Sequence, residues 1–151
     1  MKLAEALIER KALKDRIKNL EERLDRVAKV QEGDRPTEDP TALLQQIREA
    51  LEAMEGLVAK INRTNIAVRF GDRTIMEAIA RRDRLTAEHR ILRRLAQEAT
   101  PARDRFARNE IRFLPTVDAA EIQRQADAVA RDLRDLDKEI QAANWTIELT
   151  E

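Results

Sequence analysis

Apolar residues alternate at intervals of three and four positions along four long stretches of this sequence. The stretches cover residues 3–29, 40–65, 74–100 and 118–144. Such spacing places the apolar side chains on one face of an α-helix, and this face is stable only when it packs against another apolar surface. The sequence therefore predicts four long amphipathic helices that pack together.

The spacing also predicts which side chains form the core. In the first helix the expected core positions are Leu3, Ala6, Arg10, Leu13, Ile17, Leu20, Leu24 and Val27. In the second helix they are Leu44, Ile47, Leu51, Met54, Val58 and Ile61. In the third helix they are Ile75, Ala78, Arg82, Leu85, His89, Leu92 and Ala96, and in the fourth Ile122, Ala126, Val129, Leu133, Leu136 and Ile140. Further apolar residues widen these faces, namely Leu7, Ile8, Leu43, Leu57, Ile79, Ile91 and Leu95.

Capping residues mark the predicted starts of three helices. Asp39 is the expected N-cap of the second helix, with Pro40 at the first helical position, where a missing N–H costs nothing. The sequence "TIME" from Thr74 has the form of a capping box that begins the third helix. Asp118 repeats the same arrangement before the fourth helix.

Asn65 and Asn144 mark the predicted ends of the second and fourth helices. Asparagine adopts the left-handed conformation that closes a helix more readily than most residues do. Alternating apolar residues follow near residues 66–70 and 145–149, and a third such segment lies near 110–114. We expect these segments to be extended, either as a small sheet at one end of the helices or as strands that pair with another subunit.

The two halves of the sequence resemble each other. The segment "LAEALIERKAL" from Leu3 aligns with "IMEAIARRDRL" from Ile75 at an offset of 72 positions. The second and fourth helices align at an offset of 79, which places Asn65 on Asn144. We interpret this as a tandem duplication of a helical hairpin, or as two hairpins that obey the same packing rule.

The predicted fold is therefore mainly α. Hairpins over residues 2–65 and 74–144 are expected to pack as an antiparallel four-helix bundle within a single domain, residues 1–151. Helices about 40 Å long with a broad apolar face bury that face incompletely in a thin bundle. We therefore expect a homo-oligomer.

The composition narrows the classes of function. Charged residues make up 38% of the chain and aromatic residues 3%, and 29 basic residues balance 29 acidic ones. Cysteine, serine and a glycine-rich phosphate loop are all absent from the sequence, which excludes thiolate metal sites and the commonest nucleophiles. No apolar stretch approaches the roughly 18 residues that span a bilayer, and the start has no secretion signal. We expect a cytoplasmic protein with no cofactor, no metal and no membrane partner, and we favour a role without catalysis.

A polar group near the expected hairpin ends is the candidate ligand site. Its residues are Asn62, Arg63, Asn65, Arg82, Asp83, Asn144 and Trp145. Amide and guanidinium groups are suited to bind a carboxylate or a phosphate. The alternative is a hydrogen-bonded corner that satisfies helix-end carbonyls, with Arg82 and its counterpart Arg10 paired to nearby acids.

The third helix contains two further features with an open interpretation. His89 is the only histidine, and without a second histidine or a cysteine we expect a structural role instead of catalysis or metal binding. Residues 80–113 carry ten arginines and five acidic residues, whereas residues 115–151 carry four basic and nine acidic residues. A basic stripe of this kind suits a nucleic-acid backbone, but the acidic segment that follows favours pairing within or between chains.

Six blocks of sequence together resemble a known bacterial family. They are "MKLAEALIERKAL", "AKVQEG", "INRTN", "EAIARRD", "EIRFLPTVD" and "ANWTIEL", and they span nearly the whole chain. Proteins similar in these blocks are labelled septicolysin or described as domains of unknown function. The resemblance implies a compact helical bacterial protein with no established activity and no functional residues to carry over. The label implies a pore-forming toxin, but the sequence lacks the membrane-length segment or amphipathic strands that a toxin needs, so we expect no toxin activity.

Three functions remain open on this basis. We expect a self-assembling structural or interaction module. The first alternative is a small-ligand-binding protein or enzyme that uses the asparagine–arginine corner. The second alternative is nucleic-acid binding through the arginine-rich third helix.

Overall fold

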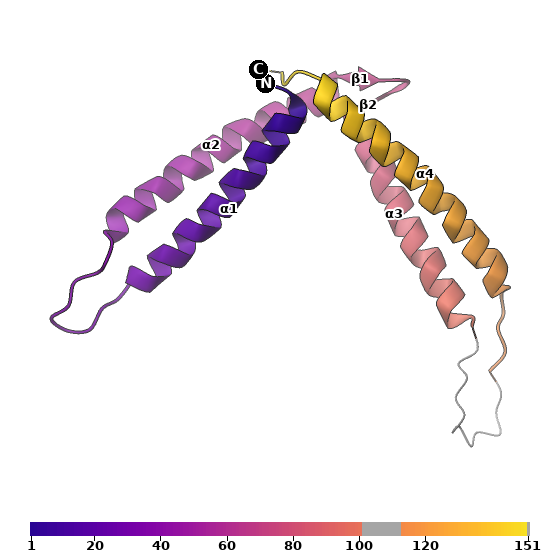
Figure 1. Cartoon of the computed structure of the whole chain (residues 1–151), viewed down its shortest axis with the longest axis horizontal. Helices are drawn as coiled ribbons and strands as arrows, with labels where there is room; N and C mark the ends of the chain where they lie inside the picture. The colour runs from indigo at the N-terminus through magenta and orange to yellow at the C-terminus, as the bar shows by residue number, and fades with distance from the viewer. Residues whose placement is uncertain (101–112, 151) are drawn as a thin grey trace. The chain divides into compact units, whose positions relative to one another are not determined.

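Four helices make up most of the chain that the structure describes. The computed structural model describes residues 1–100 and 113–150 (Figure 1). The helices are α1 (Leu3–Val27), α2 (Pro40–Ala67), α3 (Ile75–Glu98) and α4 (Ala119–Thr146). Strands β1 (Arg69–Phe70) and β2 (Arg73–Thr74) form an antiparallel pair between α2 and α3. The prediction of a mainly α protein with four long helices is confirmed.

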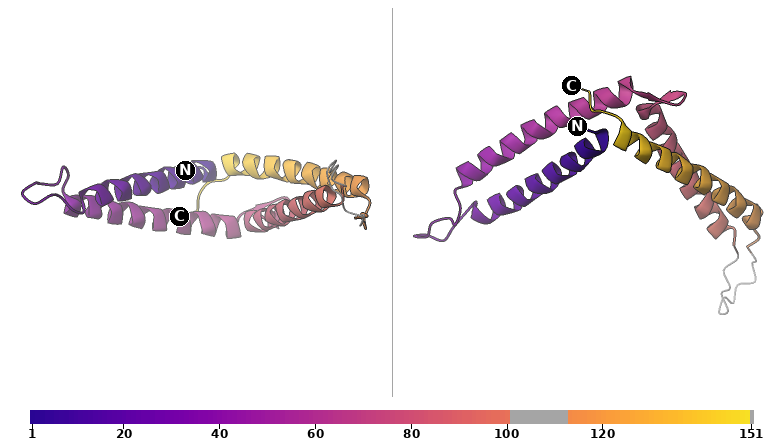
Figure 2. Two further views of the ribbon diagram at one scale, coloured as in Figure 1. Left: turned by 90° about the horizontal axis from the view of Figure 1, so that it is seen from below. Right: turned by 45° about the horizontal axis from the view of Figure 1, so that its top comes forward.

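The chain divides into two compact units. The first unit comprises Met1–Ile75 and Ala142–Glu151, and it contains α1, α2, the β1–β2 pair and the last residues of α4. The second unit comprises Met76–Gln141, which is most of α3 and α4. Within each unit the two long helices lie side by side (Figures 1 and 2). A single domain over residues 1–151 and a four-helix bundle stay predictions.

A leucine-rich core joins α1 to α2 near the loop between them. Leu20 and Val27 of α1 pack with Leu43 and Ile47 of α2, and Leu24 packs against this cluster from one side. The last turns of α1 therefore lie on the first turns of α2. Full burial of a leucine, isoleucine or valine side chain stabilises a fold by about 1.5–3 kcal/mol. This cluster therefore holds the loop end of the first unit together.

The predicted core positions of α1, α3 and α4 are buried or half-buried with one exception. The buried ones are Leu3, Ala6, Ile17, Leu20, Val27, Ile75, Ala78, Leu85, Ala96, Ala126, Leu136 and Ile140. The exception is Arg10, which is exposed. A long charged side chain keeps its guanidinium group in water even when its position lies on an apolar face.

In α2 the core prediction is wrong at two of its six positions, Leu44 and Leu51, which are exposed. The structure buries Leu43, Ala50 and Leu57, each one residue before the predicted Leu44, Leu51 and Val58. Leu51 is 49% exposed, whereas Ala50 is 3% exposed. The physical reason is that α2 carries two adjacent apolar stripes. Periodicity alone does not tell which of the two stripes faces the partner helix.

The predicted ends of α2 and α4 are also wrong, by two residues each. The helices continue past Asn65 to Ala67 and past Asn144 to Thr146. Neither asparagine is left-handed, because among the described residues only glycines have a positive φ. The helical backbone continues because the carbonyls of Thr64 and Ala143 accept hydrogen bonds from residues 68 and 147. Asparagine therefore does not close either helix.

The three predicted extended segments have different outcomes. Near 66–70, only residues 69–70 form a strand, because Ile66 and Ala67 belong to α2. Near 145–149, Glu148 forms a single antiparallel bridge with Lys2. Most of 110–114 lies outside the described residues, and Phe113 and Leu114, which are described, are exposed and in no regular element.

The predicted caps of α2 and α4 are present and equivalent. The carboxylate of Asp39 accepts a hydrogen bond from the backbone nitrogen of Thr41, and the carboxylate of Asp118 accepts one from Ala120, both at 2.9 Å. Asp39 and Asp118 are 79 positions apart, as are the first residues of α2 and α4 and the last residues of both helices. The starts of α1 and α3 are 72 positions apart. The offsets found in the sequence thus hold for the starts of all four helices and for the ends of α2 and α4.

Candidate functional site

The two ends of the chain meet at the start of α1. The backbone nitrogen of Leu3 donates to the carbonyl oxygen of Ile147 at 2.9 Å, and that of Leu149 donates to the carbonyl of Met1 at 2.8 Å. Between these bonds, Lys2 and Glu148 form the antiparallel bridge. Residues 147–149 thus pair with residues 1–3 as a short strand would.

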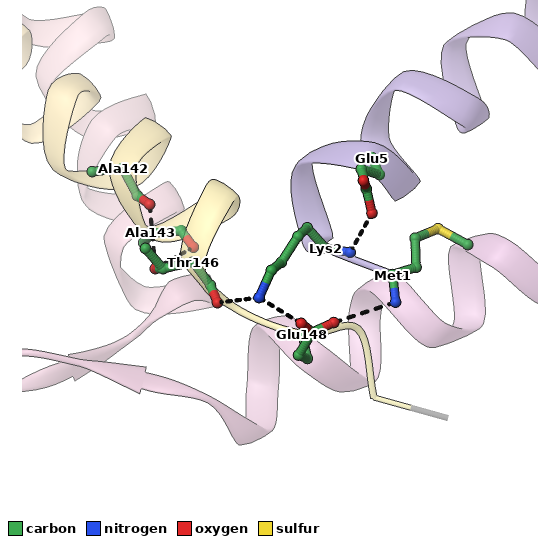
Figure 3. Close-up of polar contacts among 7 residues, drawn as sticks. All are labelled: Met1, Lys2, Glu5, Ala142, Ala143, Thr146 and Glu148. Carbon is green, nitrogen blue, oxygen red and sulfur yellow. Dashed lines mark hydrogen bonds and ion pairs between the residues drawn. The ribbon is translucent and has the colours of Figure 1, made fainter.

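Charged groups reinforce this meeting of the ends (Figure 3). Lys2 Nζ donates to the carbonyl of Thr146 at 3.1 Å and forms an ion pair with Glu148. Glu148 also accepts a hydrogen bond from the terminal amine of Met1 at 3.2 Å. These hydrogen bonds and the two positive charges hold the pKa of the Glu148 carboxyl below its ordinary value of 4.5. The backbone nitrogen of Lys2 donates to Glu5 at 2.7 Å, which caps the start of α1.

The connection between the two halves repeats this arrangement. The backbone nitrogen of Ile75 donates to the carbonyl of Val68 at 3.2 Å, as that of Leu3 does to Ile147. The β1–β2 register pairs Arg69 with Thr74, which the offsets of 79 and 72 map onto Glu148 and Lys2. The pairing of the chain ends is therefore equivalent to the β1–β2 pair, except that no turn joins the two paired segments.

Thr64 links these two equivalent connections. Its side chain is fully buried, and its hydroxyl donates to the carbonyl of Lys60 at 2.9 Å while accepting from the backbone nitrogen of Thr150 at 2.8 Å. The sequence prediction missed this role. The available signal was the core spacing of α2, since Thr64 follows Leu57 and Ile61 at steps of four and three.

The predicted ligand-site residues are divided between the two units. Asn62, Arg63, Asn65, Asn144 and Trp145 belong to the first unit, and Arg82 and Asp83 belong to the second. In the first unit Asn144 is buried and Asn65 half-buried, whereas the other three residues are exposed. In the second unit Arg82 forms an ion pair with Asp83 at 3.1 Å, so Arg82 does pair with a nearby acid. A ligand site at this corner stays a prediction.

A cluster of arginines lies on one face of α3. Arg90, Arg93 and Arg94, with His89 and Gln97, line a shallow depression of about 460 Å³, which we name the arginine surface. Within the described part of the chain, none of these three arginines forms an ion pair. His89 is half-buried, and the described residues include no group of three side chains placed to hold a metal ion.

An exposed apolar stripe runs along α2. It consists of Leu44, which is 38% exposed, Leu51 at 49% and the half-buried Val58, and we name it the α2 stripe. These residues are spaced seven apart, so they lie above one another on the helix surface. Among the described residues, no helix is both long enough and apolar enough to cross a membrane. The α2 stripe is thus a second apolar stripe of α2, next to the buried one that contains Leu43 and Leu57.

Comparisons with known proteins identify a family but no activity. The profile of a family of unknown function, DUF6847, matches residues 10–149. The fold is similar to that in the crystal structure of a functionally unknown conserved protein from Corynebacterium diphtheriae, with 40% sequence identity, a TM-score of 0.94 and 99% of each chain covered. No curated protein matches the chain. Septicolysin is named in neither description, so that resemblance stays a prediction. The chain belongs to the family of unknown function DUF6847.

Proposed function

We propose that this protein is a self-assembling structural or interaction module without catalytic activity. The single observation that supports the proposal is the α2 stripe, where Leu51 remains 49% exposed beside a core residue that is 3% exposed. Leucines repeated at intervals of seven are the pattern with which one helix packs against another. Apolar patches that stay exposed on a folded chain mark interaction surfaces.

The architecture of the first unit gives a physical reason for assembly. We propose that α1 and α2, joined by residues 28–39, form an antiparallel hairpin, and that α3 and α4 do the same. A two-helix unit covers one face of each helix and leaves the others in water. Burial of one further leucine against a partner gains about 1.5–3 kcal/mol, so a second apolar stripe favours association. Balanced charge and the absence of cysteine are consistent with a cytoplasmic location.

Sedimentation velocity over a concentration series tests the proposal. The native chain is expected to shift from monomer to a larger species as its concentration rises through the micromolar range. Leu51→Glu places a charge on the stripe and is expected to weaken association at least about tenfold. Ala53→Glu is the matched control, because Ala53 is exposed on α2 about 160° away from Leu51 around the helix. A native chain that stays monomeric at all concentrations contradicts the proposal.

The arginine surface supports a second candidate function, the binding of a polyanion such as nucleic acid. Arg90 and Arg94 lie four residues apart on α3, and like charges at this spacing destabilise a helix by a few tenths of a kcal/mol. At the equivalent positions of α1 the chain has Lys18 and Glu22, whose opposite charges attract. Phosphate oxygens would relieve the repulsion on α3, since each guanidinium group can bind them in a bidentate manner.

A further inference from the structure

We propose that the assembling contact is an antiparallel, two-fold symmetric pairing of α2 with α2 of a second copy, centred on Leu51. The inference rests on the proposed self-assembly and specifies its interface. It is argued from three observations, which are the symmetry of the apolar residues, the placement of two charges and the difference between α2 and α4.

The apolar residues of the α2 stripe are symmetric about Leu51. Leu44 precedes Leu51 by seven residues and Val58 follows it by seven. A two-fold axis through Leu51 therefore places Leu51 against Leu51 of the second copy and Leu44 against Val58 of the second copy. A two-fold interface uses the same surface on both chains. Such a contact therefore requires a stripe whose apolar residues have the same spacing in both directions along the helix.

Two charged residues within the stripe complement each other in the same arrangement. Arg48 lies three residues before Leu51 and Glu55 lies four residues after it. Both side chains are exposed, and neither forms an ion pair within the described part of the chain. The two-fold axis brings Arg48 beside Glu55 of the second copy, and it does so twice per dimer. The two charges are ten and a half ångströms apart along one helix, by the rise of about 1.5 Å per residue, so they are too distant to pair within it.

The equivalent helix lacks this surface. The offset of 79 maps Leu44, Leu51 and Val58 of α2 onto Gln123, Ala130 and Asp137 of α4. The core positions of the two helices other than Thr64, by contrast, are apolar in both, as Ile61 and Ile140 show. The fold of a hairpin therefore does not require the α2 stripe, and its apolar character is explained by a contact outside the hairpin.

The length of the stripe sets the expected strength of the contact. From Leu44 to Val58 the helix rises about 21 Å, which is short for an interface that buries about 800 Å² on each partner. We therefore expect a dimer that dissociates in the micromolar range.

Cysteine cross-linking tests the register directly, because the native chain contains no cysteine. Leu51→Cys is expected to yield a covalent dimer with a short bismaleimide, whereas the matched control Ala53→Cys is not. Leu44→Cys and Val58→Cys are each expected to cross-link poorly alone and efficiently when the two variants are mixed. Equal cross-linking of Leu51→Cys and Ala53→Cys would overturn the pairing.

A charge exchange tests the same interface without cross-linking. Arg48→Glu and Glu55→Arg each place like charges together twice per dimer and are expected to weaken association about fivefold. The double variant restores opposite charges and is expected to recover the native dissociation constant. The matched control Glu49→Arg reverses a charge on the opposite side of α2 and is expected to have little effect. Circular dichroism of each variant verifies that the helices form.

The outcomes separate this inference from the proposed function. A native chain that dimerises, but whose dimer is insensitive to both single charge variants, overturns the α2 pairing and leaves self-assembly in place. A native chain that remains monomeric overturns both. Recovery in the double variant, together with cross-linking through Leu51→Cys, supports both.

Discussion

The buried hydroxyl of Thr64 accepts a hydrogen bond from the backbone nitrogen of Thr150, 86 residues further along the chain, at 2.8 Å. This bond ties the last turn of α2 to the segment that follows α4. It joins two connections that the chain builds in the same way, one closed by a turn and one formed by the chain ends.

Replacement of Thr64 by valine is expected to weaken the first unit. Thr64→Val keeps the shape of the side chain but removes the acceptor for the Thr150 amide, and loss of such a bond costs about 1 kcal/mol of unfolding free energy. Urea denaturation measures the loss, and faster hydrogen exchange at the Thr150 amide locates it. Thr86→Val is the control, because the Thr86 hydroxyl donates within its own helix, to the carbonyl of Arg82, and has no long-range partner among the described residues. Equal losses in both variants would contradict the role of Thr64.

A circular permutant is expected to keep the fold. The β1–β2 pair is closed by the two residues Gly71 and Asp72, and the equivalent positions after Leu149 are Thr150 and Glu151. Joining residue 151 to Met1, with Gly-Asp at positions 150–151, and opening the chain between Gly71 and Asp72 exchanges the two connections. Gly71 has a φ of +62°, which explains the choice of glycine in the new turn. The helix content and the amide hydrogen-exchange rates of core residues should match those of the native chain. An unfolded permutant would contradict the equivalence of the two connections.

Acid is expected to loosen the meeting of the chain ends. Lys2 and the terminal amine lower the pKa of Glu148 in the folded chain. The contribution of this carboxylate to stability is therefore fully present above its unfolded pKa, near 4.5, and is lost as the pH falls through the lower folded value. In the Glu148→Gln variant, the unfolding temperature should depend less on pH in the acidic range. Glu9→Gln, at an exposed carboxylate of α1, should leave it unchanged.

Replacement by alanine is expected to change the unfolding free energy in opposite directions at two glycines. Gly56 lies inside α2, and a Cβ atom there would meet nothing within 4 Å, so Gly56→Ala should raise the unfolding free energy by about 0.5–1 kcal/mol. Gly71 has a positive φ, so Gly71→Ala should lower it by a similar amount. Thermal and urea denaturation of both variants measure the difference in sign.

The arginine surface is expected to bind heparin in a salt-dependent manner. Reversal of Arg90, Arg93 and Arg94 to glutamate should abolish retention at low salt, because the attraction comes from these three guanidinium groups, which form no ion pair with the residues that the structure describes. Reversal of Arg131 and Arg134, exposed arginines of α4, is the control and should reduce retention only slightly. A native chain that is not retained at about 50 mM salt would exclude the second candidate function.

The sequence predicts the helices of this protein well because the same physical rule acts along each of them. Apolar spacing locates four helices, and Asp39 and Asp118 locate two of their starts, since a cap satisfies backbone groups that have no other local partner. The choice between adjacent stripes in α2 is different. Leu43 and Leu44 are equally apolar, and only the partner helix decides which one is buried. The offset of 79 offered the missing information, because the core of α4 maps onto Leu43, Ala50 and Leu57.

The candidate site is harder to predict because it depends on contacts distant in sequence. Asn65 and Asn144 are predicted as site residues because they are polar and lie near helix ends. The buried long-range hydrogen bond is instead made by Thr64. Nothing in the local pattern around Thr64 indicates that Thr150 approaches it. Pairing of Lys2 with Glu148 likewise requires that the two chain ends meet, which the similarity of the two halves implies only once the β1–β2 connection is known.

In the proposed assembly, the polar residues Gln123 and Asp137 and the small Ala130 on α4 limit how many copies can associate. If α2 and α4 both had an exposed apolar stripe, each molecule would have two surfaces for association, and further copies could add at each end of the assembly. With one such stripe per molecule, association stops once the stripes of two molecules have packed against each other. Under the proposed pairing, the difference between α4 and α2 therefore limits the assembly to a dimer.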